Sequence, residues 1–404
     1  MKYVDGGVCA AKGFTAAGTH CGIRKNRTKN DISLIFSERR ASACAVYTQN
    51  LVKGAPIEVT RKHLEDGCAQ AVIVNSGNAN TCNANGVYIA EETAKLTSKA
   101  LGIKTEDVIV ASTGVIGQQM TIDPFAAGIP VLVKLLSKDG CDDATEGIMT
   151  TDTVKKQVAV EFEIEGKKVR VGGIAKGSGM IHPNMATMLV FITTDCAIVP
   201  AMLQSALSDC VRKTFNMISV DGDTSTNDMV SVLANGLAGN ELITWKNDSY
   251  DAFYKGLYAV MEGLCRKIAK DGEGATKLIV CNVKGGKDYE TCAICAKSVI
   301  SSSLLKAAMF GADANWGRVL CALGYSGADI DVTKVSIAFE SSAGRINVCK
   351  DGFGIDFSED NAKKILTENE ILIDITVGDS DFSAKAFGCD LTYDYVRING
   401  DYRT

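Results

Sequence analysis

Residues 176–195 read Lys-Gly-Ser-Gly-Met-Ile-His-Pro-Asn-Met-Ala-Thr-Met-Leu-Val-Phe-Ile-Thr-Thr-Asp, a glycine-rich segment followed by an apolar one. Residues 188–192 form a short, continuous apolar run, which is typical of a buried strand. Thr187 would open that strand, and the strand backbone would then fix its side chain. The glycines and the proline upstream allow a sharp turn before Ala186. The stretch therefore predicts a tight turn that leads into a buried strand.

Thr187 is the candidate nucleophile. A threonine hydroxyl reacts when a base removes its proton, and the residue's own α-amine can serve once the preceding peptide bond is cut. An α-amine has a pKa of roughly 7.7 to 8.0, so it can act as a base near neutral pH. The small side chain of Ala186 leaves its carbonyl open to attack. We therefore predict self-cleavage between Ala186 and Thr187, although an Ala-Thr pair taken alone would be read as an ordinary strand start.

The composition is that of a globular protein. The chain has 404 residues, 46% of them hydrophobic, which allows a large core and two or more domains. The formal net charge is -5 and the positive charges are scattered, which argues against a nucleic-acid-binding surface. No window approaches the roughly 20 apolar residues of a membrane span, and the N-terminal residues do not resemble a secretory signal. We expect a cytoplasmic protein with no nucleic-acid or membrane partner.

Cysteines and histidines give no support for a metal site. The 15 cysteines are spread along the chain, as expected for reduced core residues. Cys292 and Cys295 form a C-x-x-C pair, but no second pair or histidine pair follows at zinc-site spacing. The histidines, His20, His63 and His182, are isolated in sequence. We therefore expect no metal and no cofactor, and a nucleophile that supplies its own base becomes more plausible.

The rest of the chain alternates strand and helix patterns. Strands are expected at 32–36, 43–47, 69–75, 158–162, 169–175 and 276–283, and residues 108–117 read as a strand that ends in a glycine turn. Helices are expected at 87–101, 142–149, from 200 onward and at 253–268. Residues 76–86 are too rich in Asn and Gly for a helix. Residues 221–228 lack the spacing and distal Glu of a calcium loop, so they are interpreted as a turn and helix cap near the site.

A second candidate feature is the strand that ends in Thr113 and Gly114. A glycine turn after a strand can present a backbone N–H and a hydroxyl together, which are the donors that stabilise the oxyanion of a tetrahedral acyl-transfer intermediate. A plain strand-end turn is the alternative. Residues 173–178 superficially resemble a phosphate-binding loop, but the Gly-Lys-Ser/Thr order and spacing are absent. Nucleotide binding there is therefore rejected.

Residues 177–188 resemble the self-cleavage segment of the ArgJ family, the glutamate N-acetyltransferases also called ornithine acetyltransferases. The resemblance runs nearly end to end and includes residues 313–318, where Ala314 replaces the proline of most members. It implies an α/β protein with an αββα-like layered, self-cleaving N-terminal-nucleophile-type fold. The main domain would cover residues 1–275 and a smaller α/β domain residues 276–404. Cleavage would yield chains 1–186 and 187–404, with two copies of each in a heterotetramer.

The resemblance also implies roles for individual residues. Thr187 would be the nucleophile, and Thr113 and Gly114 the oxyanion hole. The residues implied to bind substrate, in addition to Thr187, are Thr153, Lys176, Glu273, Asn399 and Thr404. Thr150 and Thr151 lie close enough in sequence to replace Thr153 in this role. The family places the Asn-rich loop at 76–86 close to its active site.

The reaction implied by the family moves an acetyl group from N2-acetyl-L-ornithine to Thr187, releases L-ornithine, and passes the acetyl group to L-glutamate to give N-acetyl-L-glutamate. Exchange of one amide for another requires neither ATP nor a redox cofactor. Lys176 is placed to bind the α-carboxylate that both amino acids share and to lower the pKa of the Thr187 amine. Acetyl-CoA is a possible second donor, and we expect it to be used weakly or not at all.

Two other functions are compatible with the sequence. A hydrolase would use the same nucleophile, since aminopeptidases and amidohydrolases of a related self-cleaving fold let water attack the acyl-enzyme. A binding protein that has kept the fold is disfavoured, because the residues matching the family include the nucleophile, the oxyanion hole, Lys176 and Glu273.

Overall fold

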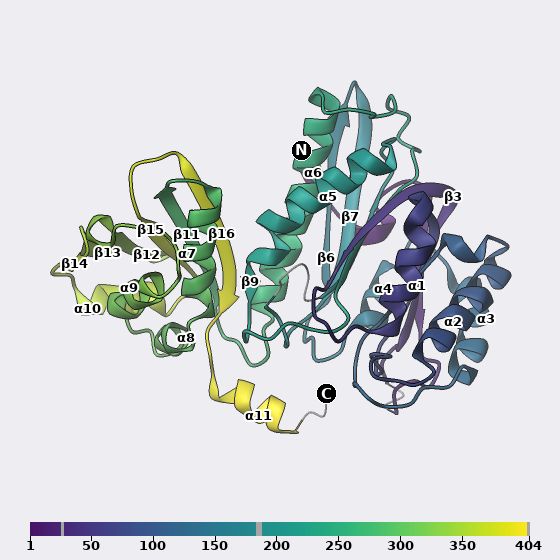
Figure 1. Ribbon diagram of the computed structural model, residues 1–404, viewed down its shortest axis with the longest axis horizontal. Coiled ribbons are helices and arrows are strands. Elements are labelled where there is room, and N and C mark those ends of the chain that lie inside the picture. The colour runs from purple at the N-terminus through teal and green to yellow at the C-terminus, as the bar shows by residue number, and fades with distance from the viewer. Residues whose placement is uncertain (26–27, 183–187, 402–404) are drawn as a thin grey trace.

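Two β-sheets organise the computed structural model, which describes residues 1–25, 28–182 and 188–401 (Figure 1). The larger sheet has the order β1-β6-β7-β8-β10-β3-β4-β5, and β2 also pairs with β3. Its strands are β1 (Lys2–Val4), β2 (Phe14–Thr19), β3 (Ile32–Tyr47), β4 (Cys68–Asn75), β5 (Val108–Ser112), β6 (Lys156–Ile164), β7 (Lys167–Lys176), β8 (Leu189–Thr194) and β10 (Met229–Ala234).

Strand β3 carries the larger sheet from one layer to the other. Its first part pairs with β2 and β4, and its last part, Ser42 to Tyr47, pairs with β10. The pairing with β4 shifts between Phe36 and Ala41, which marks an irregularity where the strand can bend. The sequence predicted two separate strands at 32–36 and 43–47. That prediction was wrong about the break, because β3 runs continuously from Ile32 to Tyr47.

Helices cover both outer faces of the folded sheet (Figure 1). They are α1 (Ala55–His63), α2 (Gly86–Leu101), α3 (Asp123–Leu135), α5 (Pro200–Lys213) and α6 (Asp248–Lys270), whereas the buried residues of α4 (Cys141–Ile148) belong to the cluster between the two halves of the sheet. One apolar cluster joins α5 and α6 to strands that include β6, β7, β8 and β10. A second cluster lies between the two halves of the sheet, and a third joins α2 and α3 to β4 and β5. This order of layers confirms the predicted αββα-like fold.

The smaller sheet has the order β14-β13-β12-β15-β11-β16-β9. Its strands are β9 (Ile218–Ser219), β11 (Leu278–Gly286), β12 (Ser336–Ser341), β13 (Gly344–Lys350), β14 (Phe353–Gly354), β15 (Glu370–Thr376) and β16 (Phe382–Cys389). Helices α7 (Tyr289–Ser301), α8 (Ser303–Phe310), α9 (Trp316–Gly324) and α10 (Glu359–Leu366) pack against it. The predicted domain boundary at residue 276 falls between α6 and β11, but β9 adds a strand from the earlier part of the chain. The boundary stays a prediction.

Helix α11 (Tyr393–Asp401) lies apart from the smaller sheet and runs beneath the larger part of the molecule (Figure 1). The Thr392 hydroxyl, just before this helix, donates to the Gly274 carbonyl over 2.7 Å. This bond fastens the end of the described chain to the turn after α6.

Most predicted helices and strands are present with small shifts, such as the helix predicted at 87–101, which is α2 (Gly86–Leu101). The segment 221–228 differs, because it leads into strand β10 and caps no helix. Strand β10, with the sequence Met-Val-Ser-Val-Leu-Ala, contains two β-branched valines and is buried throughout beside β8, which favours a strand there.

Within the described ranges, no single helix is long and apolar enough to cross a membrane. The helices α7 and α8 together meet that test by length and composition, with a bend of 59° between them. Cys292 and Cys295 lie on α7 and are buried in the core of the smaller sheet. Burial raises the pKa of Cys292 and raises that of Cys295 to about 11, so both thiols stay protonated at neutral pH.

Candidate active site

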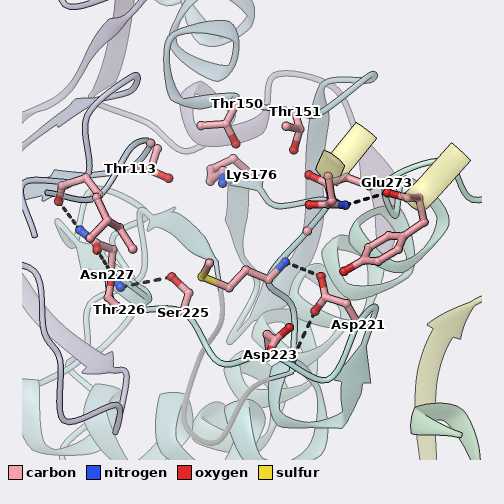
Figure 2. Close-up of a pocket in the computed structure, with 17 residues that line it drawn as sticks. Thr113, Thr150, Thr151, Lys176, Asp221, Asp223, Ser225, Thr226, Asn227 and Glu273 are labelled. Carbon is pink, nitrogen blue, oxygen red and sulfur yellow. Dashed lines mark hydrogen bonds between the residues drawn. The ribbon is translucent and has the colours of Figure 1, made fainter. Parts of the chain in front are cut away.

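A polar pocket of about 190 Å³ lies where the ends of several elements meet (Figure 2). Its small volume suits a molecule the size of an amino acid. Figure 2 shows Thr150, Thr151 and Lys176 together on one side, with Asp221 and Asp223 opposite them. The lining residues are Ala79, Thr113, Gly114, Ile116, Thr150, Thr151, Lys176, Gly179, Met180, Asp221, Asp223, Ser225, Thr226, Asn227, Glu273, Tyr395 and Asn399.

Thr113 and Gly114 reach the pocket because β4 and β5 are parallel and end at the same edge of the sheet. Gly114 has a φ of 130°, and a Cβ there would lie 2.4 Å from the Gly77 carbonyl carbon, so the position requires glycine. The Thr113 N–H donates to the Asn75 carbonyl over 3.0 Å, which fixes the turn. Within the described part of the chain, the Thr113 hydroxyl and the Gly114 N–H have no hydrogen-bond partner. Both donors are therefore available to a bound group.

Asn227 locks this turn from the opposite side. Its amide nitrogen donates to the carbonyls of Ala79 and Ser112, and its oxygen accepts from the Thr81 hydroxyl over 2.6 Å. The amide therefore links the loop after β4, the end of β5 and the segment before β10. A side chain with all these bonds satisfied is rigid, which suits a site that must hold hydrogen-bond donors in place.

Lys176 stands at the end of β7 beside a buried ion cluster. Lys156 is fully buried and pairs with Asp152 over 2.6 Å and with Asp271 over 2.5 Å. The Asp152 carboxylate also accepts the N–H of Gly177 over 2.7 Å and that of Thr150 over 2.9 Å. The cluster thus holds the residue after Lys176 and the loop that carries Thr150.

The charges of this cluster shift the pKa of its members. Burial alone would raise the pKa of Asp152, but the positive charges of Lys156 and Lys176 and the bonds it accepts outweigh burial and hold that pKa at about 2. Burial lowers the pKa of Lys176, and the Asp152 carboxylate partly offsets this effect. Lys176 differs from Lys156 in forming no ion pair with a described residue. Its ammonium group is therefore placed to meet an anionic ligand.

Glu273 forms the wall nearest to α11. The Asn399 amide donates to the Glu273 carboxylate over 2.7 Å, which joins helix α11 to the turn after α6 (Figure 2). A Cβ at Gly179 would lie 2.4 Å from the Glu273 carboxyl carbon, so only glycine permits this approach. The Glu273 N–H donates to the Ser178 carbonyl over 2.9 Å. The glycine-rich segment before the junction thus leaves space for the Glu273 carboxylate to pack against its backbone.

The pocket brings together most of the predicted site residues. Thr113, Gly114, Lys176, Glu273 and Asn399 all line it. Ala186, Thr187 and Thr404 lie outside the described residues.

Thr153 is not among the lining residues. It is exposed, and both its N–H and its hydroxyl donate to the Asp271 carboxylate. Thr150 and Thr151, the alternatives, line the pocket instead. Thr150 and Thr151 are therefore better placed than Thr153 to contact a ligand, because Thr153 is bound to Asp271.

Sequence reasoning missed several lining residues. Asp221, Asp223 and Asn227 lie in the segment expected near the site, but the sequence offered no reason to single them out. The buried cluster around Lys156 was also missed, since a lysine within an otherwise alternating strand pattern reads as solvent-exposed. Within the described ranges, no group of three or more His, Cys, Asp or Glu side chains is arranged to hold a metal ion.

This fold and this pocket define a layered α/β protein with a small polar pocket whose lining carries charges of both signs. The ArgJ family model matches residues 15–404. The arginine biosynthesis bifunctional protein ArgJ of Caldanaerobacter subterraneus subsp. tengcongensis is 49% identical over 405 residues, covering 100% of both chains. The protein of the same name from Symbiobacterium thermophilum is 50% identical over 406 residues, again covering 100% of both. This chain belongs to the ArgJ family.

A crystal structure of the arginine biosynthesis bifunctional protein argJ from Bacillus halodurans is also similar. It is 46% identical with a TM-score of 0.50, and the match covers 52% of this chain and 98% of the solved chain.

The pH dependence of folding should report the low pKa of Asp152. A carboxyl with a pKa of about 2 in the folded protein and 3.8 normally stabilises the fold above pH 3.8 and loses that contribution as pH falls through 2. Its size is about 2 kcal/mol, since one pKa unit corresponds to about 1.36 kcal/mol. The unfolding free energies of the wild type and Asp152→Asn, measured in urea, should therefore converge between about pH 4 and pH 2. A difference that stays constant over that range would contradict this assignment.

Proposed function

We propose that this protein transfers an acetyl group from N2-acetyl-L-ornithine to L-glutamate through an acetyl ester on Thr187. Membership of the ArgJ family makes it an acetyltransferase of arginine biosynthesis. The proposed transfer between these two amino acids is supported by the pocket, whose lining includes Thr113, Gly114, Lys176 and Glu273. Each of these residues has a role in acyl transfer between amino acids.

Self-cleavage prepares the nucleophile. The Thr187 hydroxyl oxygen attacks the Ala186 carbonyl carbon, and the hydroxyl proton passes to the departing amide nitrogen as the C–N bond breaks. Water then hydrolyses the resulting ester, which restores the hydroxyl and leaves a carboxylate on Ala186. The freed α-amine becomes the base for the hydroxyl. The solved Bacillus halodurans chain aligns with 52% of this chain, a length that suits one of two cleaved chains and supports the proposal.

Acetyl transfer then proceeds in two halves. The Thr187 hydroxyl attacks the acetyl carbon of N2-acetyl-L-ornithine, its proton passes through the α-amine to the leaving nitrogen, and L-ornithine departs. The α-amine of L-glutamate next attacks the acetyl ester, and the proton that it loses returns to the Thr187 oxygen. In both halves the carbonyl oxygen becomes negative, and the Thr113 hydroxyl and Gly114 N–H supply the donors that stabilise it.

The charges of the pocket suit the groups that ornithine and glutamate have in common. The Lys176 ammonium would pair with the α-carboxylate common to ornithine and glutamate. Glu273, held by Asn399, would accept hydrogen bonds from an ammonium group, and Thr150 or Thr151 would supply a hydroxyl beside Lys176. Thr404, which lies outside the described residues, stays a proposed substrate-binding residue on the family resemblance. We further propose an assembly of two copies of each cleaved chain.

The alternative is hydrolysis, in which water takes the acyl group from Thr187 in place of glutamate. The relatives that align over the whole chain are biosynthetic proteins, which favours transfer. A pocket of about 190 Å³ with charges of both signs also suits an amino-acid acceptor.

Self-cleavage predicts two chains. Mass spectrometry of protein made in a foreign host should find chains 1–186 and 187–404, and Thr187→Ala should yield a single chain without transfer activity. Thr193→Ala is the control, since it removes a threonine hydroxyl from the same strand, β8, without touching the junction. Active wild-type protein that remains a single chain would overturn the proposal.

Loss of an oxyanion donor should slow the chemical step. Thr113→Ala should lower kcat by about 10² to 10³, with a smaller change in KM, because the hydroxyl acts on the transition state. Thr113→Ser keeps the hydroxyl and should retain most of the activity. Steady-state kinetics of acetylornithine:glutamate exchange measure both variants. A kcat near that of the wild type in Thr113→Ala would exclude the role.

The donor preference follows from the size of the pocket. A cavity of about 190 Å³ accommodates acetylornithine, whereas the nucleotide portion of acetyl-CoA would have to extend outside it. We therefore expect faster glutamate acetylation with acetylornithine than with acetyl-CoA when each donor is saturating. Initial rates with each donor test this. Equal or faster turnover with acetyl-CoA would reverse the preference, and rapid peptide hydrolysis without transfer would favour the hydrolase.

A further inference from the structure

We propose that the segment 219–229 clamps both sides of the self-cleavage junction and that Asp221 and Thr224 are positioning residues for cleavage. This inference rests on the proposed cleavage between Ala186 and Thr187. It adds the part of the molecule that presents that peptide bond to the attacking hydroxyl.

The Asp221 carboxylate holds the upstream side. It accepts the N–H of Met180 over 2.6 Å and the N–H of Ile181 over 2.8 Å. The Val220 N–H donates to the Ile181 carbonyl over 2.7 Å, and Ile181 also forms a bridge with Thr224. A carboxylate that receives two successive backbone N–H groups fixes the direction of the chain as well as its position.

His182 is held by the same segment. The Thr224 hydroxyl donates to the His182 carbonyl over 2.7 Å, and the Ser219 hydroxyl lies 3.0 Å from the His182 Nδ1. His182 is the last described residue before the junction. Its backbone and its side chain are therefore both tied to residues 219–224.

Met180 shows that this clamp imposes an unusual backbone. Its φ is 55°, in the left-handed region that residues with a side chain rarely occupy. Such a conformation persists where the surroundings hold it, and the bond from the Met180 N–H to Asp221 does so. The clamp thus maintains a backbone turn six residues before Ala186.

The downstream side is held by the end of the same segment. The Met229 N–H donates to the Met188 carbonyl over 2.9 Å. From there β10 runs parallel to β8, with Met229 opposite Leu189 and Val230 opposite Val190. Both strands are buried, so this side of the junction is anchored in the core.

One continuous segment therefore fixes the chain at His182 and at Met188, on either side of the peptide bond that must be cut. Attack by a hydroxyl on the adjacent carbonyl requires the two groups in a near-attack geometry, and small displacements reduce the rate strongly. Asp221 and Thr224 exchange no proton and form no bond in the cleavage. They act by holding the chain in the geometry from which cleavage proceeds.

The test follows the conversion of full-length chain into two chains, by intact-mass measurement over time after synthesis. Thr224→Val keeps the shape of the side chain but loses the donor to His182, and Asp221→Asn replaces one acceptor by a donor that faces an N–H. Each should slow cleavage by about tenfold or more. Thr224→Ser keeps the hydroxyl and should restore cleavage.

A matched control separates the clamp from general effects of losing a buried hydroxyl. Thr392→Val removes an equally short bond, from the Thr392 hydroxyl to the Gly274 carbonyl over 2.7 Å, at a place distant in sequence from the junction. It should cleave at the wild-type rate. Thr224 does not line the pocket, so the molecules of Thr224→Val that do cleave should transfer acetyl at the wild-type kcat.

The outcomes are distinguishable. Wild-type cleavage rates in both Thr224→Val and Asp221→Asn would overturn the clamp while leaving the proposed function intact. A wild-type protein that transfers acetyl without cleavage would instead refute the self-cleavage on which the inference rests. Slow cleavage in Thr392→Val to the same extent as in Thr224→Val would assign the effect to lost stability and would also overturn the clamp.

Discussion

The ammonium group of Lys156, fully buried between Asp152 and Asp271, is the interaction on which the site depends. A buried ion pair is costly unless its remaining hydrogen-bonding positions are satisfied, and here the backbone of the site satisfies them. Asp152 accepts from the backbone of Thr150 and Gly177. Asp271 accepts from Thr153 and stands at the C-terminal cap of α6, two residues before Glu273. One cluster therefore positions both polar walls of the pocket.

This arrangement explains how the pocket can present a positive and a negative side chain that are not paired with each other. Lys156 pairs with both carboxylates of the cluster, and Lys176, which forms no ion pair with a described residue, lines the cavity. The Glu273 carboxylate accepts a hydrogen bond from the neutral amide of Asn399, which orients the carboxylate and leaves its charge in place. A ligand with its own carboxylate and ammonium group could pair with both Lys176 and Glu273. The amino acids that the proposed reaction exchanges carry both a carboxylate and an ammonium group.

Much of the site could be predicted from the sequence. The glycine turn after β5 and the resemblance to the family pointed to Thr113, Gly114, Lys176, Glu273 and Asn399, which meet in one pocket.

The rest depended on contacts that local patterns do not encode. Whether Thr150 or Thr153 faces the pocket is decided by Asp271, which is 118 residues from Thr153 in sequence. Strand β3 was split in two because a polar run from Ser37 to Arg40 interrupts its apolar pattern. In the structure this run lies at the irregularity where the strand passes between layers.

The proposed reaction depends on an acetyl group carried by Thr187, so detection of this acyl-enzyme is the decisive measurement. The cleaved protein should be mixed with N2-acetyl-L-ornithine in the absence of glutamate, quenched in acid, and examined by peptide mass spectrometry. One added acetyl group is expected on Thr187, and it should disappear when L-glutamate is supplied and reappear as N-acetyl-L-glutamate. Turnover without any acetylated Thr187, or acetyl groups on another residue in its place, would contradict the proposed reaction.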